Sequence, residues 1–153
     1  MRMRRFMSYN VCGSELRRKK KLLVASACLE DECPNLLAEY EGSHLILTVC
    51  LEEFHMNMVV SKLAGCLARC PPDELTVMAV EGSPHCVQLL YSIEEALKIV
   101  GKRTRVRYLV VNKCEIREVN PEVVKLSRYP SKIAKLIKRE ALDPSERGRV
   151  TRG

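Results

Sequence analysis

The stretch LTVMAVEGSPHC, residues 75–86, decides the fold class. Its first six residues form an apolar run, which is typical of a strand that is buried on both faces of a sheet. Ser83 and Pro84 follow as a helix N-cap and a first helical residue, because the Ser hydroxyl can accept from a backbone N–H and Pro lacks one. The helix that they open carries apolar residues on one face and should end at Gly101.

The same strand-and-helix unit recurs on both sides of this stretch. Further apolar runs predict strands at 22–27, 44–49 and 106–111, and apolar spacing predicts helices at 36–40 and 54–70 and a basic helix that begins at Ser131. Strands that alternate with helices imply right-handed crossovers and a parallel sheet. We therefore expect a three-layer α/β fold, flavodoxin-like or Rossmann-like. Its sheet should be mostly parallel, with four or five strands and helices on both faces.

The length and composition indicate one α/β domain. With 153 residues, of which 46% are apolar, the chain can bury a core without disulfide or metal support. We place that domain at 19–142, after a basic and flexible arm at 1–18 and before a polar tail at 143–153. No apolar run approaches the roughly 20 residues of a membrane span, and the N-terminus lacks the apolar core of a signal peptide. We expect a cytoplasmic protein with no membrane contact.

Positive charge gathers at the two ends of the chain, whose net charge is +7. Residues 1–21 contain eight Lys or Arg and one Glu, and residues 122–153 contain nine Lys or Arg and four acidic residues. Basic clusters bind phosphate, so a nucleic-acid-binding module that uses the termini is one candidate function. The charged segments lack the interleaved aromatic residues that single-strand binding needs, and a solvated surface also accounts for them.

Four of the eight cysteines follow the four predicted strands. Cys28, Cys50, Cys86 and Cys114 stand at or just beyond a strand end, and Cys33 lies in the same loop as Cys28. Parallel strands end at one edge of a sheet, which is where α/β proteins place their sites. We therefore expect these five cysteines to contribute to one site at the carboxyl edge.

Thiolates that converge on one edge suit a bound metal. Four cysteines can hold an iron–sulfur cluster such as [4Fe–4S], or a zinc ion. Iron–sulfur is favoured over zinc, because the ligands come from separate loops and a domain with its own core needs no structural zinc. The leading prediction is a small iron–sulfur or other cysteine-ligated metal protein. It would act in electron transfer or redox sensing with a redox partner protein.

Thiol chemistry is the alternative for the same cysteines. Cys86 would be the third residue of the helix after Ser83, and a helix N-terminus stabilises a thiolate. A thiol or persulfide sulfur-transfer enzyme would use Cys86 as nucleophile, with Cys28 or Cys114 resolving the adduct. Two simpler interpretations also stand. The cysteines could be small buried hydrophobes, or two of them could form a disulfide, for example Cys28 with Cys33.

The remaining cysteines carry weaker signals. Cys66 and Cys70 lie four residues apart on the apolar face of the helix predicted at 54–70, which favours a role in the core. Cys12 lies in the predicted arm, and we assign it no role. His85 is adjacent to Cys86, but neighbouring side chains on a helix diverge, so it is predicted to face solvent.

Overall fold

The computed structural model describes residues 3–101 and 104–142. The polar tail predicted at 143–153 lies outside these residues. The chain divides into two compact units, Met1–Val119 and Asn120–Gly153, where the sequence predicts one domain over 19–142. In the described residues, the first unit holds the sheet and the second holds two helices.

The first unit is built on a six-stranded sheet with the order β1-β3-β2-β4-β5-β6. Neighbours from β1 to β5 are parallel, and β6 is antiparallel to β5. The α/β class with a mostly parallel sheet is confirmed, with more strands than the four or five expected. The strands span Arg4–Arg5 (β1), Lys21–Ser26 (β2), Leu45–Val49 (β3), Glu74–Val80 (β4), Arg105–Asn112 (β5) and Glu115–Val119 (β6).

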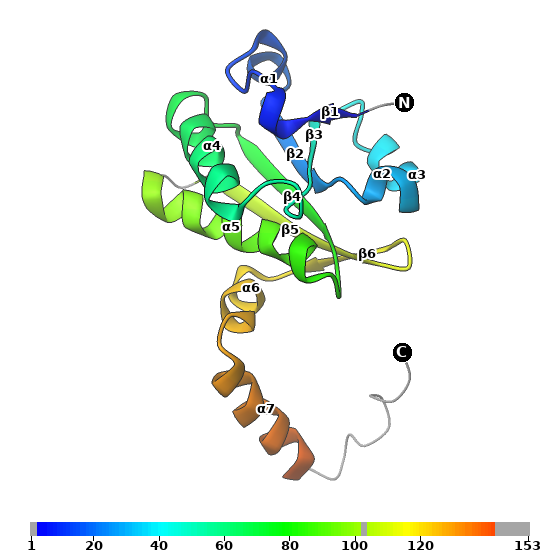
Figure 1. The fold of residues 1–153 in the computed structure, drawn as a ribbon, viewed down its shortest axis with the longest axis vertical. Helices are drawn as coiled ribbons and strands as arrows, with labels where there is room; N and C mark the ends of the chain where they lie inside the picture. The colour runs from blue at the N-terminus through cyan, green and yellow to red at the C-terminus, as the bar shows by residue number, and fades with distance from the viewer. Residues whose placement is uncertain (1–2, 102–103, 143–153) are drawn as a thin grey trace. The chain divides into compact units, whose positions relative to one another are not determined.

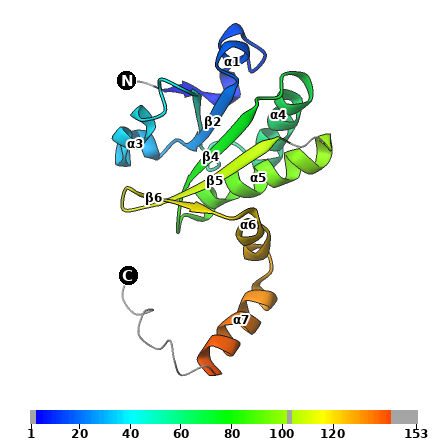
Figure 2. The ribbon, with the colours of Figure 1, turned by 180° about the vertical axis from the view of Figure 1, so that it is seen from behind.

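Helices cover both faces of the sheet, as predicted. Figure 1 shows α4 (Met56–Arg69) and α5 (Pro84–Val100) side by side on one face. Seen from behind, β2, β4 and β5 lie in front of these two helices (Figure 2). On the other face, α2 (Leu29–Glu32) and α3 (Pro34–Ala38) supply Leu29 and Leu37 to a buried apolar cluster with strand residues such as Met78.

The segment predicted as an arm forms three elements in the structure. These are β1, a 3-10 turn at Phe6–Ser8 and α1 at Ser14–Lys19. Phe6 is fully buried, and the ammonium of Lys62 in α4 donates a hydrogen bond to the carbonyl oxygen of Met7 at 2.7 Å. These contacts attach the segment to the sheet and to α4.

The helix α5 begins and ends where the sequence predicts. The hydroxyl oxygen of Ser83 accepts a hydrogen bond from the backbone N–H of Cys86 at 3.3 Å, and Pro84 is the first helical residue. Gly101 follows the helix with a φ of 65°, a conformation that glycine adopts without steric cost. These two ends fix how Cys86 is presented after β4.

The second unit contains α6 (Pro121–Ser127) and α7 (Pro130–Leu142). The Asn120 side chain accepts a hydrogen bond from the backbone N–H of Glu122 at 2.9 Å, which caps α6. The helix predicted from Ser131 corresponds to α7. In neither unit does the described part of the chain contain a helix long and apolar enough to cross a membrane.

Candidate functional site

Three of the predicted site cysteines line one small pocket at the carboxyl edge of the sheet. Cys28 follows β2, Cys50 follows β3, and Cys86 is the third residue of α5 after β4. The cavity has a volume of about 30 Å³, which is room for one or two small atoms or a water molecule. Its walls are Ser26, Ala27, Cys28, Val49, Cys50, Leu51, Glu52, Ser83, His85, Cys86 and Leu89.

Cys28 and Cys86 are in direct contact. Their Sγ atoms lie 3.9 Å apart, which is within the distance of a thiol–thiol hydrogen bond. Cys86 is buried, whereas Cys28 and Cys50 are partly exposed. The topology thus brings together residues that are 58 positions apart in the sequence.

The two thiols that touch have different electrostatic surroundings. Burial, followed by the neighbouring thiols of Cys86 and Cys50, raises the pKa of Cys28 to about 11. Cys28 is therefore a protonated thiol near neutral pH. Cys86 lies in the first turn of a 17-residue helix, at the end that carries the partial positive charge of the helix dipole. The pair thus combines a protonated thiol with a sulfur at the positive end of a helix.

A buried hydroxyl lies in the wall of the same pocket. Ser26, the last residue of β2, is 2% exposed, and its Oγ has no hydrogen-bond partner in the part of the chain that the structure describes. A buried hydroxyl without a partner loses about 1–3 kcal/mol of solvation that a bound polar group can restore. The pocket therefore offers a hydrogen-bonding group to a small polar ligand beside the two thiols. The sequence did not reveal Ser26, because it stands inside an apolar strand.

Cys33 and Cys114 form a disulfide, with their Cα atoms 5.5 Å apart. It joins the junction of α2 and α3 to the turn between β5 and β6. The sequence predicts all five cysteines in one site, whereas the structure groups three around the pocket and pairs the other two. A disulfide was expected as an alternative, but for Cys28 with Cys33. In the bonded state neither Cys33 nor Cys114 has a thiolate to offer a metal.

The metal prediction receives no support from the geometry. Among residues 3–101 and 104–142, no group of three or more His, Cys, Asp or Glu side chains is arranged to hold a metal ion. Cys50 lines the pocket, but the contact between thiols there is the one between Cys28 and Cys86. An iron–sulfur cluster or zinc ion on these residues stays a prediction.

The other predicted side chains fall where their patterns place them, except that Cys70, expected in the core, follows the end of α4 and is partly exposed. His85 lies on the pocket rim with an exposed side chain, in line with the solvent-facing role expected for it. Cys66 is 1% exposed and belongs to the core. Cys70 and Cys12 are partly exposed.

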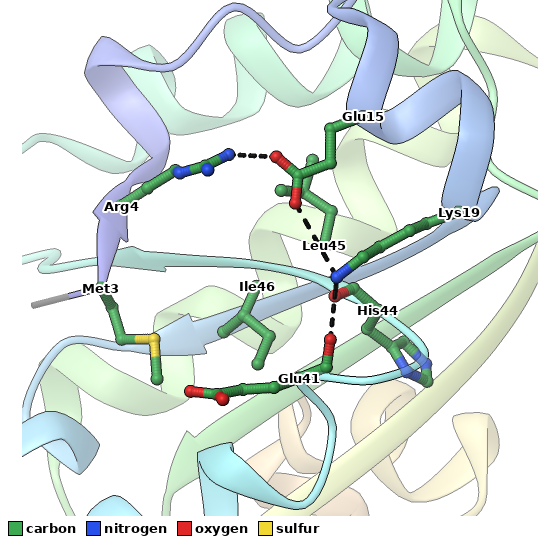
Figure 3. Close-up of a pocket in the computed structure, with 8 residues that line it drawn as sticks. All are labelled: Met3, Arg4, Glu15, Lys19, Glu41, His44, Leu45 and Ile46. Carbon is green, nitrogen blue, oxygen red and sulfur yellow. Dashed lines mark hydrogen bonds and ion pairs between the residues drawn. The ribbon is translucent and has the colours of Figure 1, made fainter. Parts of the chain in front are cut away.

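A larger pocket of about 300 Å³ lies at the amino end of β3 (Figure 3). Three of its charged side chains, Arg4, Glu15 and Lys19, have partners within the pocket. Arg4 pairs with Glu15, and the ammonium of Lys19 donates to the carbonyl oxygens of Glu41 and His44, each at 2.8 Å. The pocket contains no thiol, and the sequence did not reveal it, because its walls come from separate segments.

Comparison with known proteins identifies the family. Residues 15–143 match the family model of a Rossmann-like domain, and the chain belongs to this family. Comparisons with curated proteins and with solved structures find no match. The family assignment agrees with the mostly parallel sheet, and it does not indicate the chemistry of the protein.

Proposed function

We propose that this protein is a thiol redox protein in which Cys86 and Cys28 cycle between a dithiol and a disulfide. The observation that supports this function is the 3.9 Å separation of the two Sγ atoms inside one pocket. A disulfide bond needs a separation of about 2.0 Å, so a small movement of either side chain closes it. Redox sensing was one of the roles expected from the sequence, and here it needs no metal.

The pocket suits a small oxidant. A cavity of about 30 Å³ admits a peroxide oxygen but no large disulfide substrate. The unpartnered hydroxyl of Ser26 is available to a polar group in that cavity. We therefore propose a hydroperoxide as the oxidant and an external dithiol, such as that of a redox partner protein, as the reductant.

The proposed oxidation has two balanced steps. The thiolate of Cys86 attacks one oxygen of the hydroperoxide. The O–O bond breaks, a sulfenic acid forms on Cys86, and the released alkoxide or hydroxide takes up a proton. The sulfur of Cys28 then attacks the sulfur of Cys86, and the S–O bond breaks. Water leaves with the Cys28 proton, and the disulfide forms. The two electrons that the thiols lose reduce the peroxide.

The roles of the two cysteines follow from their surroundings. Cys86 is the nucleophile because its sulfur lies in the pocket at the positive end of the α5 dipole. Cys28 is the resolving thiol, because its raised pKa keeps it protonated until Cys86 has been oxidised. In the resting state the Sγ atoms of Cys86 and Cys28 already lie within hydrogen-bond distance of each other.

The test is to treat the fully reduced protein with equimolar hydrogen peroxide and map its thiols by mass spectrometry. We expect a Cys28–Cys86 disulfide in the unmodified chain and a sulfenic acid trapped on Cys86 by dimedone in the Cys28→Ser variant. The Cys50→Ser variant, which alters the same pocket, should still form the disulfide. If Cys86 reacts with peroxide no faster than the partly exposed cysteines, such as Cys50, the proposal is contradicted.

The same preparation separates the other candidate functions. A brown protein that contains iron and acid-labile sulfide after anaerobic purification would replace the thiol cycle with the cluster. A stable persulfide on Cys86 after exposure to a sulfur donor would favour sulfur transfer. The proposal includes the cytoplasmic location expected from the sequence, because the cytoplasm supplies dithiol reductants.

A further inference from the structure

A second group of thiols lies at the opposite edge of the sheet. Cys70 follows α4 and precedes β4, and Cys12 precedes α1, which leads into β2. The Cys12 thiol lies close enough to Cys70 for that thiol to raise the pKa of Cys12. Cys66, one helical turn before Cys70, belongs to the same group but is buried in the core. Two of the three sulfurs are therefore both adjacent and partly exposed.

Cys70 also lines an open cavity with a basic wall. The cavity has a volume of about 350 Å³, which is large enough for a peptide-sized small molecule. Arg17, Lys20 and Arg69 contribute to its wall, against the single acidic residue Asp73. None of the three basic side chains takes part in an ion pair among the described residues. The cavity thus offers positive charge to an anionic ligand beside a thiol.

We propose that Cys70 is a thiol–disulfide exchange site for an anionic low-molecular-weight disulfide, with Cys12 as the resolving thiol. The cavity binds the anionic groups of the disulfide through Arg17 and Arg69, and this places its S–S bond next to Cys70. This site uses other cysteines and another oxidant than the carboxyl-edge pair, so it stands independently of the function proposed above.

The exchange is balanced without a further reactant. The thiolate of Cys70 attacks one sulfur of the small disulfide, whose S–S bond breaks and releases one small thiolate. The thiol of Cys12 then attacks the Cys70 sulfur of the mixed disulfide. This releases the second small thiol and leaves a Cys12–Cys70 disulfide. The protein pair is oxidised, and one small disulfide is reduced to two thiols.

The surroundings of Cys12 suit the resolving role. The neighbouring Cys70 thiol and burial raise the pKa of the Cys12 thiol, while Arg69 and Arg17 act in the opposite direction. The Cys12 thiol lies beside Cys70, where it can attack a mixed disulfide on that residue. Oxidation would then join the segment before α1 to the end of α4 by a covalent bond.

The experiment uses glutathione disulfide, which is anionic, and hydroxyethyl disulfide, which is uncharged. In the Cys12→Ser variant of the full chain we expect glutathione disulfide to leave a mixed disulfide on Cys70, identified by peptide mass spectrometry. Adding Arg17→Gln and Arg69→Gln should slow this reaction about tenfold and leave the rate with hydroxyethyl disulfide unchanged. Arg18→Gln is the matched control, because Arg18 lies on α1 but does not line the cavity.

Two results would overturn the proposal. The first is that glutathione disulfide reacts with Cys70 no faster than with Cys50. The second is that replacing the two arginines slows the reactions of glutathione disulfide and hydroxyethyl disulfide equally. If the Cys12→Ser variant does not fold, the unmodified chain gives the same answer through a Cys12–Cys70 disulfide. Peptide mapping keeps these results separate from the Cys28–Cys86 pair, so the two proposals can fail independently.

Discussion

Nε2 of His44 lies 3.4 Å from Oε1 of Glu74, and both side chains are buried near the amino end of the sheet. The other ring nitrogen of His44, Nδ1, is 2.8 Å from the hydroxyl oxygen of Ser43. The guanidinium of Arg105 approaches the second carboxylate oxygen of Glu74 at 3.5 Å. Burial lowers the pKa of His44, although Glu74 acts to raise it. The imidazole is therefore neutral in the folded protein at neutral pH.

This histidine makes stability depend on pH. Because the folded-state pKa lies below the unfolded value of about 6.5, the unfolded chain binds more protons in mild acid. The free energy of unfolding should be highest above about pH 6.5 and should decrease as the pH falls toward the folded-state pKa of His44. Urea unfolding at about pH 7.5 and 5.5 measures this, and His44→Gln should flatten the difference. His55→Gln, at an exposed position, should keep it, and an identical pH dependence in both variants would refute the assignment.

The hydrogen bond from the hydroxyl of Tyr108 to the carboxylate of Glu94 gives a second prediction. Both residues are buried, and burial followed by Glu94 raises the pKa of the tyrosine. Tyr108→Phe would leave a buried carboxylate without this donor and should lower the free energy of unfolding by about 1.5–3 kcal/mol. Chemical denaturation measures the loss. The double variant Tyr108→Phe/Glu94→Leu, which also removes the acceptor, should recover part of the lost stability. A further loss of stability in the double variant would argue against the Tyr108–Glu94 hydrogen bond as the cause.

The pKa of Cys28, raised to about 11, predicts how this thiol alkylates. In the reduced protein, iodoacetamide should modify Cys28 slowly at about pH 8 and faster as the pH approaches 11. Cys86→Ser should lower the pKa of Cys28, because Cys86 raises it through charge and a hydrogen bond. Burial is the largest cause, so the value should stay above the usual 9.0. Cys50→Ser should produce a smaller change in the same direction.

The disulfide between Cys33 and Cys114 should contribute to stability. It closes a loop with a sequence separation of 81 residues, for which the expected contribution is about 2–4 kcal/mol. Urea unfolding with and without reductant should show this difference. The Cys33→Ser/Cys114→Ser variant should match the reduced protein and not respond to reductant. A double variant as stable as the oxidised protein would show that the disulfide adds nothing.

The central part of the fold could be predicted because its signals are local. The strands β2 to β5 are apolar runs, and the two ends of α5 are marked by Ser83 and Gly101. The strands β1 and β6 could not be predicted in this way. The first has two residues, and the second is an amphipathic edge strand after a turn in which Lys113 and Cys114 take positive φ values of 50° and 61°. Such a turn usually contains Asn or Gly, so the sequence carries no hairpin signal there.

The candidate site could be predicted in its topology but not in its contacts. Parallel strands bring Cys28, Cys50 and Cys86 to one edge, and all three line the pocket there. The sequence spacing of the cysteines does not determine which of their sulfur atoms come into contact, because that depends on distances across the folded sheet. Cys114 followed its strand as expected, but the hairpin turn carries it to Cys33 instead of the pocket. Cys12 had no signal, because Cys70 lies beyond two strands and four helices in the sequence.

The short strand β1 has a consequence for self-association. Arg4 and Arg5 pair with Leu47 and Thr48 and so occupy the backbone donors and acceptors at the outer side of β3. Both arginines are exposed, and charged side chains on a two-residue edge strand make the addition of a further strand unfavourable. The buried, apolar β3 would otherwise offer a template for strand exchange between molecules. Two basic residues at the rim of the sheet therefore help to keep neighbouring molecules apart.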